Sequence, residues 1–204
     1  MQRLIPIAMI MAVLAVPALA GHPGERLDEV TAGKEPAFEA ISGPAPDLDL
    51  VGADGQQFDL ADLAGQIVVV NLRPSGCLAP CRAQHDRLAQ TVASLNASPM
   101  REMVRFITIA DRPDGIDTLG ADNWSVAAPV GALEVLEARL ASRSERNEEP
   151  PMLHLFDRDG RHVAIFHGTD FAPLNLLLHI NGLTNAHPRP EPGGLLDRAI
   201  GWFR

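Results

Sequence analysis

The sequence has few cysteines, few aromatic residues and no concentration of positive charge. Of its 204 residues only two are cysteine, none is tyrosine, and aromatic residues make up 4%. Acidic residues outnumber basic ones by 26 to 17, which gives a formal net charge of -9 at pH 7. Nucleic-acid binders use Lys/Arg clusters against phosphates and aromatic rings against bases. We therefore expect no nucleic-acid partner.

Long apolar segments are also scarce. One sustained apolar run, residues 4–16, follows Arg3 and precedes Pro17 and the small-residue ending of residues 18–20. This order is typical of a secretory signal peptide with an A-x-A cleavage site. The run is shorter than the roughly 20 apolar residues that cross a bilayer. We expect residues 1–20 to be removed on export, leaving a periplasmic chain without a stable membrane span; the alternative is a retained N-terminal anchor.

The remaining chain is long enough for one domain with a substantial core. Residues 21–45 are rich in Pro and Gly and lack periodicity, which predicts a linker or an N-terminal arm. Residues 46–183 are expected to form the domain. Residues 184–204 form a Pro-rich tail whose end has the apolar spacing of a short amphipathic helix.

Within the domain, the apolar pattern predicts alternating strands and helices. Residues 67–72 are apolar at nearly every position, which is typical of a strand covered on both faces. Beyond Cys81 the apolar residues recur at helical spacing. The order β-α-β-α-β-β-α predicts an α/β sandwich around a mixed sheet. The expected elements are a hairpin at 47–58, strands at 67–72 and 104–110, helices at 81–99, 133–142 and 174–182, and a second hairpin at 152–166.

The two cysteines, Cys77 and Cys81, lie at the junction of the predicted strand and helix. A disulfide across so short a loop removes little entropy from the unfolded chain, so the pair suits redox or metal chemistry better than a structural role. The helix dipole and the flanking Arg73 and Arg82 should lower the thiol pKa values. Two converging thiolates can exchange disulfides or bind Cu(I). A structural zinc site would need four good ligands.

Residues 46–112 resemble the SCO/SenC copper chaperones, which are thioredoxin-fold proteins that serve assembly of the copper centre of cytochrome oxidase. The three-residue spacer of the C-x-x-x-C pair is the most specific feature. The resemblance implies a thioredoxin-like fold, Cu(I) held by Cys77 and Cys81, and a cuproprotein partner such as cytochrome c oxidase. It is carried by the turn Asp54-Gly55, strand 67–72, Cys77 and Cys81, and strand 106–109 with Asp111 and Asp114, and continues more weakly through Trp124 and 157–161.

Four positions depart from the family's pattern. The motif proline stands at Pro80, before the second cysteine, and Arg82 follows that cysteine. The family's copper-ligating histidine falls at Glu149. Pro151 stands where thioredoxin-like disulfide reductases and TlpA-like proteins carry a cis-proline. These departures favour thiol chemistry over copper.

A third copper ligand would therefore come from elsewhere, and the candidates are His154, His85 and Glu149. His154 follows Pro151 within a predicted strand and could approach the cysteines. His85 shares a helix face with Cys81 but lies about 12 Å along the axis from Cys77. Glu149 offers an oxygen, which suits soft Cu(I) poorly. The other histidines are expected at the surface (His162, His167, His179, His187) or to be incidental (His22).

The leading prediction is a periplasmic SCO-like protein that uses Cys77 and Cys81 to bind copper or to reduce the cysteines of a copper-receiving partner. The alternative is a thiol-disulfide oxidoreductase without copper, in which Cys77 attacks a client disulfide and Cys81 resolves the mixed disulfide. A peroxidase is a weaker alternative, because Pro74, Ser75 and Gly76 only partly imitate a peroxiredoxin site. A binding domain that has lost both functions is a further alternative.

Overall fold

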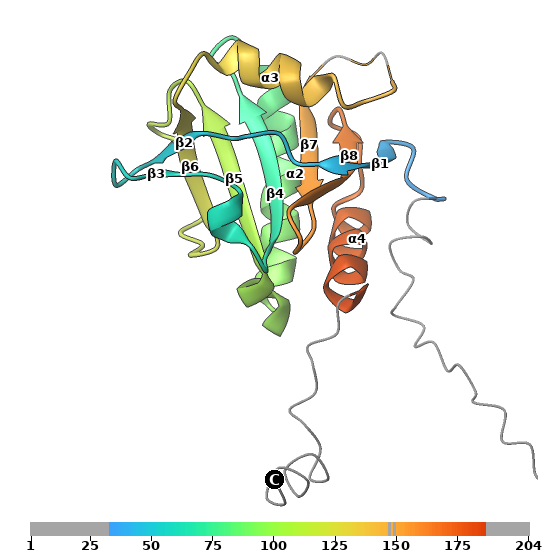
Figure 1. The fold of residues 1–204 in the computed structure, drawn as a ribbon. Coiled ribbons are helices and arrows are strands. Elements are labelled where there is room, and N and C mark those ends of the chain that lie inside the picture. Colours follow the sequence, from blue (N-terminus) through green and yellow to red (C-terminus); the bar gives the residue numbers. More distant parts are fainter. Residues whose placement is uncertain (1–32, 147, 149, 187–204) are drawn as a thin grey trace, which may run out of the picture.

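The computed structural model describes residues 33–146, 148 and 150–186. The predicted signal peptide, Glu149, His22, His187 and the predicted helix of the C-terminal tail lie outside these residues. Within them, one sheet has the strand order β1-β8-β7-β4-β5-β6-β2-β3 (Figure 1). No helix of the described part is long and apolar enough to cross a membrane.

The sheet is mixed, as the sequence predicted. Strands β4, β5 and β6 run parallel, and every other pairing is antiparallel. The strands are β1 (Phe38–Pro44), β2 (Leu50–Gly52), β3 (Gln57–Phe58), β4 (Ile67–Arg73), β5 (Val104–Ala110), β6 (Trp124–Pro129), β7 (Met152–Phe156) and β8 (Arg161–His167). The helices are α2 (Ala79–Asn96), α3 (Leu133–Ala141) and α4 (Pro173–Ala186), with 3-10 turns at Ala61–Leu63 and Pro99–Met103.

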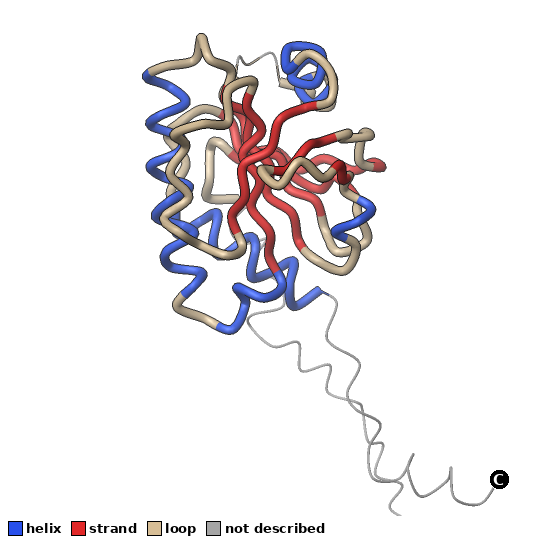
Figure 2. Tube along the Cα trace, turned by 90° about the vertical axis from the view of Figure 1, so that its left-hand side faces the viewer, coloured by secondary structure: helices blue, strands red, loops and turns tan. Residues whose placement is uncertain are grey.

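Helices cover both faces of the sheet, which gives the predicted sandwich (Figure 2). Successive residues of a strand point to opposite faces. Accordingly, Ile67 and Val69 of β4 pack in the cluster formed with α2 and α4, whereas Val68 and Val70 pack in the cluster formed with α3. The predicted strand 67–72 is therefore buried on both sides.

Two strands were not predicted from the sequence. Strand β1 lies within the segment 21–45 that was expected to be a linker or arm, so the sheet begins before residue 46. Within the described sheet this edge strand pairs only with β8. It alternates in exposure beyond its first two residues and ends in Gly43 and Pro44, which weakens its strand signal. Strand β6 has mostly small side chains after Trp124, and pairs with β5 and β2 on its two sides.

Helix α4 is longer than predicted. The sequence placed its end at Gly182, but the helix continues to Ala186 and so enters the segment assigned to the tail. Glycine weakens a helix interior by only about 1 kcal/mol, and packing can outweigh this. Here Leu176 and Ile180 are buried in the cluster shared with α2.

Candidate functional site

Cys77 and Cys81 are joined by a disulfide at the carboxyl end of β4, with a Cα–Cα distance of 5.6 Å. The backbone N–H of Cys77 donates a hydrogen bond of 2.9 Å to the carbonyl of Pro74, which closes a tight turn after the strand. Helix α2 begins two residues later and has Pro80 in its first turn, where the missing N–H leaves no helical hydrogen bond unmade. The strand-turn-helix junction predicted from the sequence therefore holds both sulfurs.

The two cysteines differ in exposure. Cys81 is only 2% exposed, and its Sγ lies 3.9 Å from the carbonyl oxygen of Leu72. Cys77 is half-buried and lines a pocket of about 540 Å³. A nucleophile that enters this pocket therefore meets the sulfur of Cys77 and not that of Cys81.

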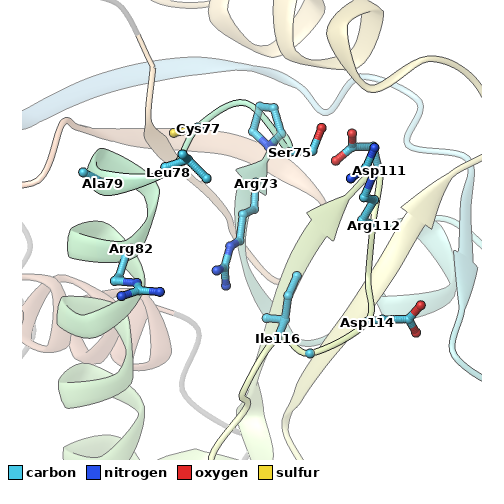
Figure 3. A pocket seen from close by; sticks show the side chains of 12 residues that line it. Arg73, Ser75, Cys77, Leu78, Ala79, Arg82, Asp111, Arg112, Asp114 and Ile116 are labelled. Carbon is cyan, nitrogen blue, oxygen red and sulfur yellow. The ribbon is translucent and has the colours of Figure 1, made fainter.

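The pocket lies between the loops that follow the parallel strands β4 and β5 and the start of α2 (Figure 3). Ligand sites of open α/β sheets form at such carboxyl ends. Asp111 accepts hydrogen bonds from the side chain and backbone N–H of Ser75, which lower the pKa of this carboxyl and join the two loops. The residues that line the pocket are Arg73, Pro74, Ser75, Cys77, Leu78, Ala79, Arg82, Asp111, Arg112, Asp114, Gly115 and Ile116.

Arginines contribute most of the charge in the pocket. Arg73 is the last residue of β4, and Arg82 lies on the first turns of α2. Their side chains extend into the space between the helix and the loop after β5 (Figure 3). The structure thus places both arginines that the sequence associated with the cysteines at the lining of one pocket with Cys77.

A buried hydrogen-bond chain supports the floor of the site. The indole N–H of Trp124 donates to the hydroxyl of Thr108 at 3.0 Å, and this hydroxyl donates to the side-chain carbonyl of Asn71 at 2.8 Å. All three residues are buried, so their polar groups are satisfied within the core. The chain ties β4, β5 and β6 together, and its member Asn71 lies two residues before the end of β4.

A second chain of hydrogen bonds joins α2 to Pro151. The side-chain amide of Gln84, one turn after Cys81, donates to the carbonyl of Gly168 at 3.1 Å. The backbone N–H of Gly168 donates to the carbonyl of Pro151 at 2.8 Å. The peptide bond between Pro150 and Pro151 is cis, as the comparison with thioredoxin-like reductases implied. Sequence reasoning did not single out Gln84, because a glutamine on a helix has no distinctive spacing.

His154, one of the three candidates for a third copper ligand, does not lie on the cysteine side of the sheet, which excludes it. It is opposite Val70 of β4, whose side chain packs on the α3 face. The helix that carries Cys81 packs on the other face. His154 Nδ1 instead lies 3.2 Å from Nε2 of His162. The sequence left His154 open as a candidate because every residue of β7 is buried, so the pattern could not distinguish the two faces of this strand.

Three histidines predicted at the surface are also buried. His162 stacks on Phe156, His167 Nε2 lies 2.6 Å from Oε2 of Glu39, and the ring of His179 packs near Phe38. They are 1%, 3% and 4% exposed, respectively. Burial lowers the pKa of His162 to about 4, and repulsion from Arg143 adds to the effect. Burial, followed by repulsion from His162, also lowers the pKa of His154 well below its usual range.

His85 lies on the cysteine face, where its ring packs in the core while its buried Nδ1 has no hydrogen-bond partner among the described residues. Its ring is 4.8 Å from that of Trp124, and the backbone of Asp117 hydrogen-bonds to it. Burial lowers its pKa, and the charge of Arg73 adds to the shift. Among the described residues, no group of three His, Cys, Asp or Glu side chains is arranged to hold a metal ion. Through Cys77, the cysteine pair opens onto the pocket on this face, whereas His85 does not line it.

Comparisons with solved structures confirm the fold. BsSco, a member of the Sco family of cytochrome c oxidase assembly proteins, is 14% identical with a TM-score of 0.57, covering 72% of this chain and 96% of that chain. Arabidopsis thaliana ScoI with copper bound is 13% identical with a TM-score of 0.51, and the match covers 71% of this chain and 100% of that chain. A thiol:disulfide interchange protein of the thioredoxin family from Chlorobium tepidum is 22% identical with a TM-score of 0.51, and the match covers 71% of this chain and 99% of that chain.

No family model and no curated protein matches the sequence significantly. The similarity is therefore one of structure, at identities that show a common fold. The predicted thioredoxin-like α/β architecture is confirmed, and so is the resemblance in fold to the Sco proteins. The chain has a thioredoxin-like fold, similar in structure to Sco proteins and to thiol:disulfide interchange proteins, with a disulfide at the start of α2.

Proposed function

We propose that this protein is an exported, Sco-like thiol protein that exchanges disulfides through Cys77 and Cys81. The single observation that carries the proposal is the asymmetry of the disulfide: Cys77 opens onto a pocket, whereas Cys81 is 2% exposed. Exchange needs one sulfur that a client can reach and a second that leaves within the protein. The predicted signal peptide supports a periplasmic location, where disulfides persist.

The reaction follows from this arrangement. A client thiolate attacks Sγ of Cys77, the Cys77–Cys81 bond breaks, and Cys81 leaves as a thiolate near the first N–H groups of α2. The positive end of the helix dipole stabilises that charge. A second client thiolate then attacks the client sulfur of the mixed disulfide and releases Cys77. Two electrons pass from the client to the protein; the reverse sequence reduces a client disulfide.

A second candidate function is the transfer of Cu(I) by the reduced cysteines. Two observations favour it: the three-residue spacer between Cys77 and Cys81, and the structural similarity to a ScoI with copper bound. Thiolates are good ligands for Cu(I). In this candidate function Cu(I) is the cargo, and the partner is a cuproprotein such as the copper subunit of cytochrome c oxidase. His154 does not supply the third ligand, because it packs on the opposite face.

One experiment on the mature protein separates the two functions. The redox potential and exchange rate of the Cys77–Cys81 pair are measured against a dithiol peptide, and Cu(I) binding of the reduced protein is measured against a competing chelator. The Cys77→Ser/Cys81→Ser variant is the control for both. Exchange that this variant loses supports the first function; tight Cu(I) binding that it loses supports the second. A wild-type protein inert to the dithiol peptide would refute disulfide exchange.

A further inference from the structure

The pocket beside Cys77 differs in charge from the rest of the molecule. The chain as a whole has nine more acidic than basic residues. Yet three arginines and only two aspartates line this pocket, so its charge has the opposite sign. The contrast matters for recognition, because a cleft of one sign attracts ligands of the other and rejects ligands of its own sign.

The two aspartates of the pocket form no ion pair with Arg73 or Arg82 among the described residues. Asp111 is engaged by Ser75 and lies close enough to Arg112 for their charges to interact. Asp114 points away from Arg73 and Arg82 (Figure 3). None of the ion pairs found among the described residues includes Arg73 or Arg82. Two guanidinium groups with no ion-pair partner in the described part of the chain therefore face the same pocket as the reactive sulfur.

An apolar surface adjoins these charges. Leu78 follows Cys77 directly and is 77% exposed, the largest exposed fraction among the large hydrophobic residues of the described chain. Ile116 lies on the opposite side of the pocket and is half-buried. An exposed leucine next to a reactive sulfur offers apolar contact to a segment that lies across the site.

We propose that this pocket selects client segments that carry a carboxylate side chain beside the reactive cysteine. The proposal rests on the proposed disulfide exchange and names its substrate class. The guanidinium groups of Arg73 and Arg82 can hold such a carboxylate by charge-assisted, bidentate hydrogen bonds. The client thiolate then lies at Sγ of Cys77, and its backbone crosses Leu78. Arg73 and Arg82 act here as specificity residues, while the cysteines perform the bond exchange.

The test uses three synthetic peptides with one cysteine flanked on both sides by Glu, Gln or Lys. Oxidised mature protein is mixed with each peptide, and formation of the mixed disulfide at Cys77 is followed by rapid quenching and mass spectrometry. Rates are compared per thiolate, because the flanking charges change the peptide's own thiol pKa. The variants are Arg73→Gln/Arg82→Gln, the single charge reversal Arg82→Glu on an exposed helix position, and Arg101→Gln. Arg101 is a matched control, since it is exposed and precedes β5 at the end opposite the pocket.

The wild type should react about tenfold faster with the Glu peptide than with the Lys peptide at low ionic strength. This preference should shrink in about 0.5 M salt, where the Debye length is only a few ångströms. It should disappear in the double variant, reverse in Arg82→Glu, and persist in Arg101→Gln. Equal rates of the wild type with all three peptides would overturn the pocket inference and leave disulfide exchange standing. Reaction with none of them would overturn both.

Discussion

The two faces of the sheet both carry residues capable of chemistry, but they present them differently. On one side, the disulfide of Cys77 and Cys81 opens onto a pocket lined with charged side chains. On the other, His154, His162 and His167 lie with Glu39 beneath the segment between α3 and β7, and all four are less than 10% exposed. Residue type alone would make the second group, the histidine cluster, the better metal site. However, the histidine cluster is buried and Cys77 lines a pocket, so an external ligand can reach only the cysteine side of these two groups.

The partners within the histidine cluster explain why it is structural. Glu39 accepts hydrogen bonds from the hydroxyl of Ser144 at 2.6 Å and from the N–H of Glu145 at 2.7 Å. Although burial raises the pKa of Glu39, these bonds and the contact with His167 lower it overall. The carboxylate thus fastens the segment after α3 to the edge strand β1. The cysteine side, by contrast, leaves charged groups directed at solvent.

The sharpest test of this difference is on the cysteine side. In Cys81→Ser the free Cys77 should react with an aromatic disulfide reagent about a hundredfold faster than the free Cys81 in Cys77→Ser, because Cys81 is buried. Absorbance of the released thiolate measures both rates. Cys81→Ser should also accumulate mixed disulfides with a client peptide. Equal labelling rates would show that the pocket does not determine which sulfur reacts.

On the histidine side, the largest expected effect is on stability. His154→Ala removes a buried ring and leaves Nε2 of His162 without its partner at 3.2 Å. We expect a loss of about 3–4 kcal/mol in the free energy of unfolding, from the cavity and the unmatched polar group. Urea denaturation of wild type and variant measures it.

The same variant should leave the cysteine chemistry unaltered. Its Cys77–Cys81 redox potential and the Cu(I) affinity of its reduced form should match those of the wild type at a temperature where both are folded. A Cu(I) affinity that falls at least about tenfold would mean that His154 reaches the cysteines, and would break the separation of the two faces.

A third prediction concerns the pH dependence of stability and involves only the histidine cluster. The pKa of His162 is lowered from 6.5 to about 4, so between these values the unfolded chain binds a proton that the folded chain does not. Stability must then fall as pH decreases through this window, by about 2–3 kcal/mol from this residue. Urea midpoints at pH 6.5 and pH 4.5 should move closer together in His162→Gln. An unchanged pH dependence would show that His162 is not held neutral by burial.

The sequence predicted the cysteine side better than the histidine side, for a physical reason. Strand β4 and the start of α2 are strongly marked by a β-branched run, a Pro/Gly turn and a change of period, and these features are local. In β7 the sequence does not distinguish the two faces. Both faces are buried, and every residue of the strand except His154 is apolar. Which side His154 occupies depends on its register with β4, a long-range property.

The pocket was predictable only in part. Arg73 and Arg82 are near the cysteines in sequence, so their placement followed from the local elements. The bond between Ser75 and Asp111 joins residues 36 positions apart across two strand ends. Because the carboxyl ends of parallel strands meet at one edge of a sheet, the proximity of Ser75 and Asp111 could have been predicted. Strand β1 gave no such signal, since its place at the sheet edge depends on pairing with β8.

The smallest expected effect concerns the charge balance of the pocket. Asp111→Asn removes one of its two negative charges but keeps a side chain that can accept a hydrogen bond from Ser75. The rate with the Glu-flanked peptide should rise about twofold at low ionic strength, because one repelling charge is gone from an exposed, salt-screened position. His162→Gln, on the other face, should leave that rate unaltered. A rate that fell in Asp111→Asn would mean that the carboxylate's main role is to hold the loop in place, so that loop geometry outweighs charge at this site.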